Sequence, residues 1–326
     1  MGMFYDFKDV EVRTEIVIEQ SEIEKILDIE VEIIKQCKRD RRFNEQSEKH
    51  SEAYESLYSL TVRKTKEIDF SSELLQEYLK MRDNEKEDSE AIIRGMYSAA
   101  LLEIICKANS GKSIFIDGKD KKFNYLFYRA KNASNLTIKN FKGNAIFASV
   151  GGNGQIECIT LHNINGNYTF LDSGRNGKMK HIVLSNITGD YTFAYAGGDK
   201  GVIEHTILID ITGERTFTNA ATRGTLKHLT LTNIKGDNTF AEGNLDGRAE
   251  YITLTDITGR HILGPVGLHG SVEHLLREED ITTKQKEIVK KINELAKSMH
   301  SLSFEEQKFE YNEIARLQKE IFAGET

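Results

Sequence analysis

The chain has 326 residues, a net charge of −7, and a composition that is 39% hydrophobic and 29% charged. This is the composition of an ordinary soluble protein, and the length favours more than one domain. The sequence contains no run of about 18 apolar residues that would cross a membrane. No secretory signal is visible, so we expect a cytoplasmic protein without membrane contact. Cys37, Cys106 and Cys158 lie far apart and form no CxxC pair, which argues against a disulfide framework or a zinc knuckle.

Charge divides the chain into three parts. Residues 1–110 carry 25 acidic and 17 basic side chains, residues 111–277 carry 15 and 19, and residues 278–326 carry 11 and 8. The net charge therefore changes from −8 to +4 to −3. We predict a mostly α-helical N-terminal region over 1–110, a parallel β-solenoid over 111–277 and a C-terminal helical hairpin over 278–326.

The N-terminal region is expected to contain one strand followed by helices. Val10 to Ile18 alternates in polarity, which is the period of a strand. Ser21 and Glu24 form a capping-box pattern, which predicts a helix that starts there and ends near residue 40. Further helices are predicted near 46–66, 72–83 and 88–108.

A 23-residue repeat runs through residues 113–277. Its turn glycines, which are spaced by 23, 23, 24, 23 and 23 residues, are Gly143, Gly166, Gly189, Gly213, Gly236 and Gly259. Within a unit, Ile182 and Leu184 alternate with Val183, as they do in a strand. Because one unit cannot bury its own apolar face, the units should stack. The fold class is therefore mainly β, a parallel β-helix of about seven coils, each with three short strands.

Equivalent positions of successive coils should form ladders. We expect an interior phenylalanine stack and, one residue earlier, a column of outward threonines. The phenylalanines are Phe147, Phe170, Phe193, Phe217 and Phe240, and the threonines are Thr169, Thr192, Thr216 and Thr239. A column of alternating charge should form cross-strand pairs, and it comprises Glu157, Lys180, Glu204, Lys227, Glu250 and Glu273.

An asparagine column precedes the tight turn of each coil, where asparagine can satisfy backbone groups and its own neighbours. Its members are Asn140, Asn163, Asn186, Asp210, Asn233 and Asp256. In coil length and in this ladder the chain resembles the right-handed parallel β-helix superfamily that includes pectate lyases. It is also similar to uncharacterised microbial proteins with N-I-T-G repeats. The first resemblance implies a glycan-binding or glycan-cleaving protein, but the catalytic motifs of the superfamily do not map onto these coils.

A histidine column is the candidate metal site. His181, His205 and His228 occupy consecutive coils, after Cys158 and before Tyr251 and His274. Imidazole and thiolate are metal ligands, and rungs about 4.8 Å apart approach the spacing that one ion needs. A straight ladder offers an ion only two or three of these ligands. We therefore expect a structural stack, with no metal, no catalytic residue and no cofactor.

Two surfaces are candidates for binding a partner. Six loops, which form the loop edge of the solenoid, lie at 148–154, 171–177, 194–201, 218–224, 241–247 and 264–270. They vary from coil to coil on an unchanging framework, which is typical of recognition, although turns free to drift would look the same. Their charged residues are Asp172, Arg175, Asp199, Lys200, Arg223, Glu242 and Asp246. A basic patch on the first coils would attract an acidic glycan or nucleic acid, or would face the acidic N-terminal helices. It comprises Lys112, Lys119, Lys121, Lys122, Arg129 and Lys131.

The C-terminal region predicts two helices, over 282–300 and 303–322, the second opened by a capping box of Ser303 and Glu306. We expect both flanking regions to cap the exposed ends of the solenoid. The alternative is that the hairpin binds a partner or a second copy of the chain. The function that the sequence favours is a non-enzymatic binding or scaffold protein acting through protein–protein contacts, and the alternative is a glycan-binding or glycan-cleaving β-helix.

Overall fold

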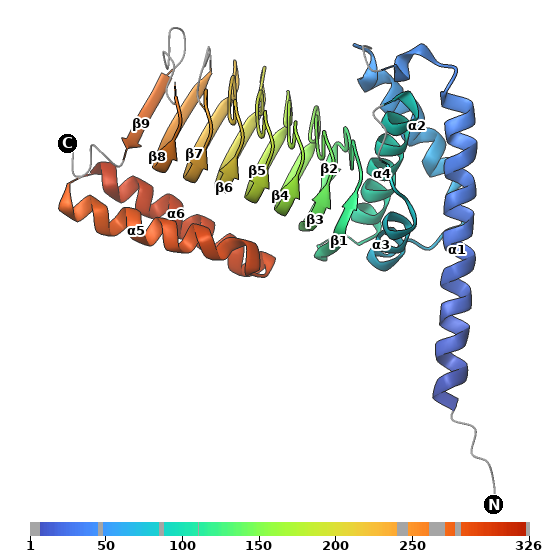
Figure 1. The fold of residues 1–326 in the computed structure, drawn as a ribbon. Coiled ribbons are helices and arrows are strands. Elements are labelled where there is room, and N and C mark those ends of the chain that lie inside the picture. The colour runs from blue at the N-terminus through green and yellow to red at the C-terminus, as the bar shows by residue number, and fades with distance from the viewer. Residues whose placement is uncertain are drawn as a thin grey trace, which may run out of the picture.

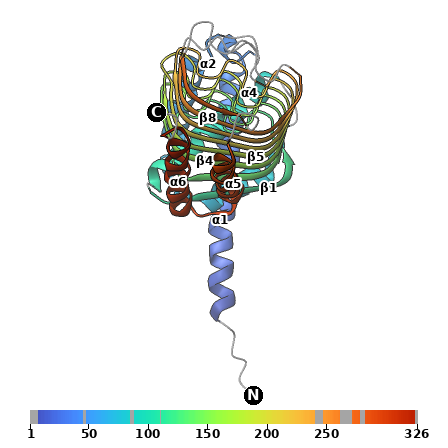
Figure 2. The ribbon, with the colours of Figure 1, turned by 90° about the vertical axis from the view of Figure 1, so that its left-hand side faces the viewer.

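The computed structural model describes residues 7–44, 48–84, 88–109, 111–239, 247–260, 271–277 and 282–323, without the side chains of 7–21, 271 and 273. Four helices lie at one end of a parallel β-solenoid, and a helical hairpin lies along the flank of the solenoid (Figures 1 and 2). The predicted fold class is confirmed, with about six turns instead of seven. No helix of the described ranges is both long and apolar enough to cross a membrane.

The N-terminal region consists of helices α1 (Phe7–Cys37), α2 (His50–Lys64), α3 (Ser72–Met81) and α4 (Ser89–Ala108), with a 3-10 turn at Arg41–Phe43. The predicted helices near 46–66, 72–83 and 88–108 are confirmed. The predicted strand at 10–18 is wrong, because this segment belongs to α1, and α1 therefore starts well before Ser21. A helix satisfies its own backbone groups, whereas a single strand outside the sheet would leave them unpaired.

The solenoid is one parallel sheet with the strand order β1-β3-β4-β5-β6-β7-β8-β9. Its strands are β1 (Ile114–Lys122), β2 (Asn132–Ala133, paired with β4), β3 (Leu136–Lys142), β4 (Gln155–Asn165), β5 (Lys178–Thr188), β6 (Val202–Thr212), β7 (Thr225–Lys235), β8 (Arg248–Thr258) and β9 (Ser271–Arg277). The register follows the repeat, so that Leu184 pairs with Leu208 and Ile187 with Ile211. Each coil of β4 to β8 thus has one strand of 11 residues instead of three short ones.

The rest of each coil is a turn, and its backbone still bonds from coil to coil. Within one coil the amide of Tyr168 donates to Asp190 of the next coil and the amide of Phe170 donates to Ile146 of the preceding one. Alternate residues have a positive φ, for example 63° at Tyr168, 61° at Phe170 and 51° at Asp172. The turns therefore extend the stack beyond the sheet and contribute to its stability.

The interior is formed by the ladders that the repeat predicts. Phe170, Phe193 and Phe217 stack with ring centroids 5.5 and 5.3 Å apart, and Phe147 continues the column at 6.4 Å. Phe240 lies outside the described residues. The asparagine ladder is confirmed as well, since Asn163 donates to Asn140 over 2.6 Å and Asn186 to Asn163 over 3.1 Å. All six members of this ladder have a φ of 52–57°, a left-handed conformation that asparagine and aspartate tolerate best.

The threonine column beside the phenylalanines was predicted to point outward, and this is wrong. Thr169, Thr192, Thr216 and Thr239 are fully buried. Each hydroxyl donates to the glycine carbonyl three residues earlier, over 3.0–3.2 Å. Side chains do not alternate between inward and outward here, because the segment is a turn and not a regular strand. The phenylalanines of this turn have a left-handed φ.

Helix α4 caps the N-terminal end of the solenoid, as predicted. It is apolar nearly all round and lies so close to the first coil that a Cβ on Gly95 would meet the carbonyl oxygen of Tyr125 at 2.3 Å. Polar groups satisfy the open backbone of this coil. The Ser98 hydroxyl accepts from the amide of Phe127 over 3.0 Å, and the Glu103 carboxylate accepts from the amide of Lys131 over 2.7 Å. The end of the stack is therefore closed to further strands.

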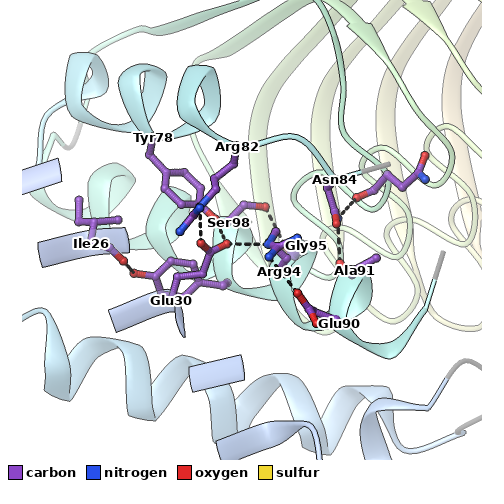
Figure 3. A network of polar contacts seen from close by, with 12 residues as sticks. Ile26, Glu30, Tyr78, Arg82, Asn84, Glu90, Ala91, Arg94, Gly95 and Ser98 are labelled. Carbon is purple, nitrogen blue, oxygen red and sulfur yellow. Dashed lines mark hydrogen bonds and ion pairs between the residues drawn. The ribbon is translucent and has the colours of Figure 1, made fainter. Parts of the chain in front are cut away.

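A buried charge holds the cap together (Figure 3). The Glu30 side chain is fully buried and lies 2.6 Å from Arg82 Nε and 3.0 Å from Arg94 Nε. Tyr78 donates its hydroxyl to the same carboxylate over 2.9 Å. The Arg82 contact has the distance of an ion pair but not the geometry of a hydrogen bond. Next to this cluster, Asn84 continues the strand pattern by bridging to Phe123.

The C-terminal hairpin consists of α5 (Thr283–Ser298), a 3-10 turn at Met299–Ser301 and α6 (Phe304–Ala323). The two predicted helices are confirmed, but the prediction that they cap the C-terminal end is wrong. The hairpin lies across the outer face of strands β4 to β8 (Figures 1 and 2). This face carries Val183, Ile207 and Ile209, which form an apolar cluster with the hairpin. Covering these side chains explains the placement.

Candidate functional site

A partly open cavity of about 190 Å³ lies between the variable loops and the N-terminal cap, at the start of the loop edge. Its walls come from α2 and from the first coils. The lining residues are Glu48, Ser51, Tyr54, Arg129, Lys131, Ser149, Gly152, Asn153, Asp172 and Arg175. The cavity brings together residues of both predicted surfaces, namely Asp172 and Arg175 of the loop edge and Arg129 and Lys131 of the basic patch.

The Arg129 guanidinium, which lines this cavity, does not have a hydrogen-bond partner for each of its nitrogens within the described ranges. Its Nε is buried and has no hydrogen-bond partner among the described residues. The guanidinium lies 5.4 Å from the ring centroid of Tyr128, over the aromatic face. An aromatic face stabilises the positive charge, but it does not replace the strong, directed hydrogen bond that a carboxylate would accept. Lys131, in contrast, forms an ion pair with Glu55 of α2.

Arg175 joins two successive loops. Its Nε donates to Asp199 over 2.6 Å, and its Nη1 lies 3.8 Å from Asp172. Burial raises the pKa of Asp172, and the neighbouring arginines offset only part of this effect. Two carboxyl groups from neighbouring coils thus meet one guanidinium at the rim of the cavity.

The other members of the two predicted surfaces are spread more widely. Lys200 and Arg223 are exposed on the next loops, while Glu242 and Asp246 lie outside the described residues. In the basic patch, Lys112, Lys119 and Lys122 are exposed, and Lys121 pairs with Asp83 of the N-terminal region over 3.2 Å. The N-terminal region thus neutralises Lys121 and Lys131, which is the arrangement expected if the patch faces acidic helices.

Two tyrosines of the turns are exposed, and one of them, Tyr195, belongs to the loop 194–201. Tyr168 and Tyr195 are 40% and 44% exposed, which is high for residues of their size. Tyr168 stacks on Tyr191 with centroids 5.3 Å apart, and Arg215 donates to the Tyr191 hydroxyl. The loop edge therefore combines aromatic and charged groups on a rigid framework.

The histidine column forms a continuous stack beneath helix α6. His181, His205 and His228 have centroids 5.1 and 5.0 Å apart, and Tyr251 and His274 continue the column at 5.0 and 4.7 Å. Because the planes are nearly parallel, the ring nitrogens of neighbouring rungs point side by side instead of converging on one ion. Among the described residues no group of three histidine, cysteine or acidic side chains has the arrangement of a metal site.

Burial dominates the chemistry of this column. It lowers the pKa of His181 to about 4 and that of His205 to about 3, and it also lowers the pKa of His228. At the start of the column it raises the pKa of the Cys158 thiol to about 12. The thiol is therefore unreactive at neutral pH, and the imidazoles are uncharged.

The alternating charge ladder lies beside the histidines and pairs as predicted over part of its length. Lys180 donates to Glu157 over 2.6 Å, and Lys227 lies 3.5 Å from Glu204. Glu250 pairs with Arg248 within its own strand, at 3.8 Å. The side chain of Glu273 lies outside the described residues. These partly exposed pairs stabilise the solenoid modestly and show no feature of a binding site.

Two glutamines of α6, which the sequence reading did not single out, hold the hairpin to the sheet. Gln318 is fully buried, donates to the carbonyl of Leu229 over 3.1 Å and lies 2.9 Å from Nδ1 of His228. Gln307 accepts from Thr160 over 3.2 Å and from the Cys158 thiol over 3.5 Å. Their spacing of 11 residues on the apolar face of one helix was the signal available in the sequence.

Comparison with known protein families, curated proteins and solved structures gives no match for this chain. Inferences about its function therefore rest on the geometry described above.

Proposed function

We propose that this protein is a non-enzymatic recognition module that binds an acidic segment of a partner protein along its loop edge. The observation that carries the proposal is the cavity beside Arg129, whose Nε is buried without a hydrogen-bond partner among the described residues. A buried unpaired guanidinium nitrogen costs about 1–3 kcal/mol or more. Arg129 lines the cavity, and a carboxylate entering it would match the planar geometry of the guanidinium.

The size and the setting of the cavity favour a protein partner over a free small molecule. Its volume of about 190 Å³ is below the roughly 300–1,000 Å³ of typical small-molecule sites, but it can accommodate a side chain. Beyond the cavity the exposed Tyr195, Lys200 and Arg223 continue along the next loops. An extended segment with one acidic residue in the cavity would cross these loops at the spacing of the coils.

A displayed library of random peptides tests this proposal. We expect enrichment of a motif with an aspartate or glutamate, and we expect Arg129→Ala to weaken the selected peptides by at least tenfold. Arg260→Ala is the matched control, since Arg260 is also an arginine of the solenoid but is exposed and paired with Asp237. No acidic motif, or equal binding by the Arg129→Ala variant, would contradict the proposal.

A glycan-cleaving β-helix is the second candidate, and the carboxyl pair around Arg175 favours it. Glycosidases use one carboxyl group held protonated and a second that is ionised. Asp172, with its raised pKa, has the property of the first, and Asp199, which is paired with Arg175, is the neighbouring carboxyl group. Release of reducing ends from a panel of acidic and neutral glycans, abolished by Asp172→Asn, would support this candidate. Unchanged glycans after prolonged incubation would exclude it for that panel.

A further inference from the structure

Six of the nine histidines of the chain lie where the hairpin meets the sheet. Four belong to the column that α6 covers, with Tyr311 stacked on His181 at 4.3 Å and Phe322 against His274 at 4.7 Å. The other two, His162 of β4 and His300 of the hairpin turn, stack on each other at 4.4 Å. No other part of the described structure contains more than one histidine.

This interface contains polar groups beside its apolar cluster, and some of these polar groups have no hydrogen-bond partner among the described residues. Of the eight buried side-chain atoms that lack a hydrogen-bond partner in the described residues, four belong to the hairpin or to the sheet face beneath it. They are His181 Nδ1, Thr255 Oγ1, Glu310 Oε2 and Tyr311 Oη. The outer face of the sheet also carries Thr160, Thr230 and Thr253 between its few apolar residues. A face of this kind holds the hairpin less firmly than an apolar core of the same area.

Cations face the histidine column from the hairpin side. Lys308 of α6 lowers the pKa of His181, and Lys319 lowers those of His205 and His228. A positive charge on one imidazole would therefore be repelled by the lysines of α6. It would also be repelled by the other protonated imidazoles of the stack. The remaining titratable groups around the column are Lys180, Lys227, Glu157, Glu204, Glu250 and Cys158 on the strands and Glu310 and Tyr311 on α6.

We propose that the hairpin α5–α6 is a pH-sensitive latch, which lies on the sheet while the histidine column is neutral and is released when the column is protonated. The groups on the strands stay in place when the hairpin leaves, so Glu157, Glu204 and Glu250 still neutralise part of the new charge. Lys308, Lys319 and the desolvation imposed by α6 are removed. Release thus removes the lysines and the desolvation that disfavour protonation, and it leaves the glutamates of the strands in place, although His228 loses its favourable hydrogen bond with Gln318.

Proton linkage gives the direction and the size of the effect. The closed-state pKa values of His181 and His205, about 4 and 3, lie below the ordinary value of 6.5. Closure is therefore most stable above pH 6.5 and weakens as the pH falls toward these values. Between pH 7 and pH 5, two such groups raise the opening constant by up to several hundredfold, and repulsion within the exposed stack reduces this to about a hundredfold.

Cys158 reports on the latch directly. It is 2% exposed beneath α6, whereas Cys37 and Cys106 are buried in the N-terminal region. The full chain is treated with 4,4′-dithiodipyridine, which reacts with thiols in acid as well as at neutral pH, and each cysteine is followed by mass spectrometry. We expect the labelling of Cys158, relative to glutathione, to rise about a hundredfold from pH 7 to pH 5 while the other two stay protected.

A double variant, His181→Gln with His205→Gln, removes the two titrating groups and should keep Cys158 protected at pH 5. His50→Gln is the matched control, because His50 is buried in the cap and burial lowers its pKa too; it should behave like the native chain. Hydrogen exchange of α5 and α6 in the native chain, corrected for intrinsic rates, needs no variant and should show the same loss of protection. Protection of Cys158 at pH 5, simultaneous labelling of all three cysteines, or opening of the double variant like the native chain would overturn the proposal.

Discussion

Replacing Glu30 with glutamine tests how the N-terminal cap is held together. The substitution keeps the size of the side chain and an acceptor for Tyr78, but it removes the negative charge. Arg82 and Arg94 would then face each other without an anion, with side chains only 28% and 20% exposed. Breaking a buried ion pair in this way costs about 3–5 kcal/mol. Because both arginines retain some contact with water, we expect the lower end, about 3 kcal/mol.

The loss should appear first in the cap and not in the solenoid. A change of about 3 kcal/mol raises the opening constant of the cap by roughly two orders of magnitude. Hydrogen exchange of the α3 and α4 amides measures this change directly. It avoids the assumption that a chain with helical and solenoid parts unfolds in one step.

The matched control is Glu32→Gln on the same helix. Glu32 also pairs with a cation, Lys64, at 2.5 Å, but its side chain is 60% exposed. Solvent screens this pair, so the control should leave exchange unchanged within error. If the α3 and α4 amides are as well protected from exchange in the Glu30→Gln variant as in the Glu32→Gln variant, the buried carboxylate does not hold the cap. The packing of α4 alone must then do so.

Substitutions at three positions in the coils test the ladders by urea denaturation. Phe193→Ala removes the centre of the aromatic stack and should lower the free energy of unfolding by about 3–5 kcal/mol. Phe193→Leu should lower it by less than half of that amount. Equal losses would mean that the site collapses around any side chain. Gly189→Ala would place a methyl group 2.2 Å from the carbonyl oxygen of Gly166, at a φ of 150°, and should destabilise the chain by about 2 kcal/mol or more; wild-type stability would show that the coils separate easily. Asn186→Ala should cost about 1 kcal/mol through the lost ladder bond and the φ of 52°, and Asn186→Gly should cost less; the reverse order would refute the conformational part of this reasoning.

The interior of the solenoid could be predicted from the sequence because stacking places each repeated residue in the same environment. Phe170 and Phe193, 23 residues apart, therefore had to be neighbours once the repeat was recognised. The threonines beside them misled the prediction, because their direction depends on φ values that alternation does not reveal. At the N-terminus, the alternation of residues 10–18 resembled a strand, but no partner strand was available to that segment.

The placement of the hairpin could not be predicted in the same way. The amphipathic pattern of its helices predicted that they pack on another part of the protein, but amphipathicity does not identify that surface. The informative residues were Ile207 and Ile209, which occupy outward positions of β6 although they are apolar. An apolar pair on the outer face of a solenoid indicates that another element covers it. The cavity at Arg129 was harder still, since its α2 wall lies about 80 residues earlier in the chain.

The two helical regions cover the solenoid by different physical means. At the N-terminal end, the Glu30 carboxylate is matched by two arginines and a tyrosine, and Ser98 and Glu103 satisfy the backbone of the first coil. On the flank, buried groups such as His181 Nδ1 and Tyr311 Oη have no hydrogen-bond partner in the described structure. An end that must not pair with other strands needs the first arrangement, because opening it would expose a sheet edge. A flank that only shields the outer face of paired strands can open without that risk, and it is there that the chain places six of its nine histidines.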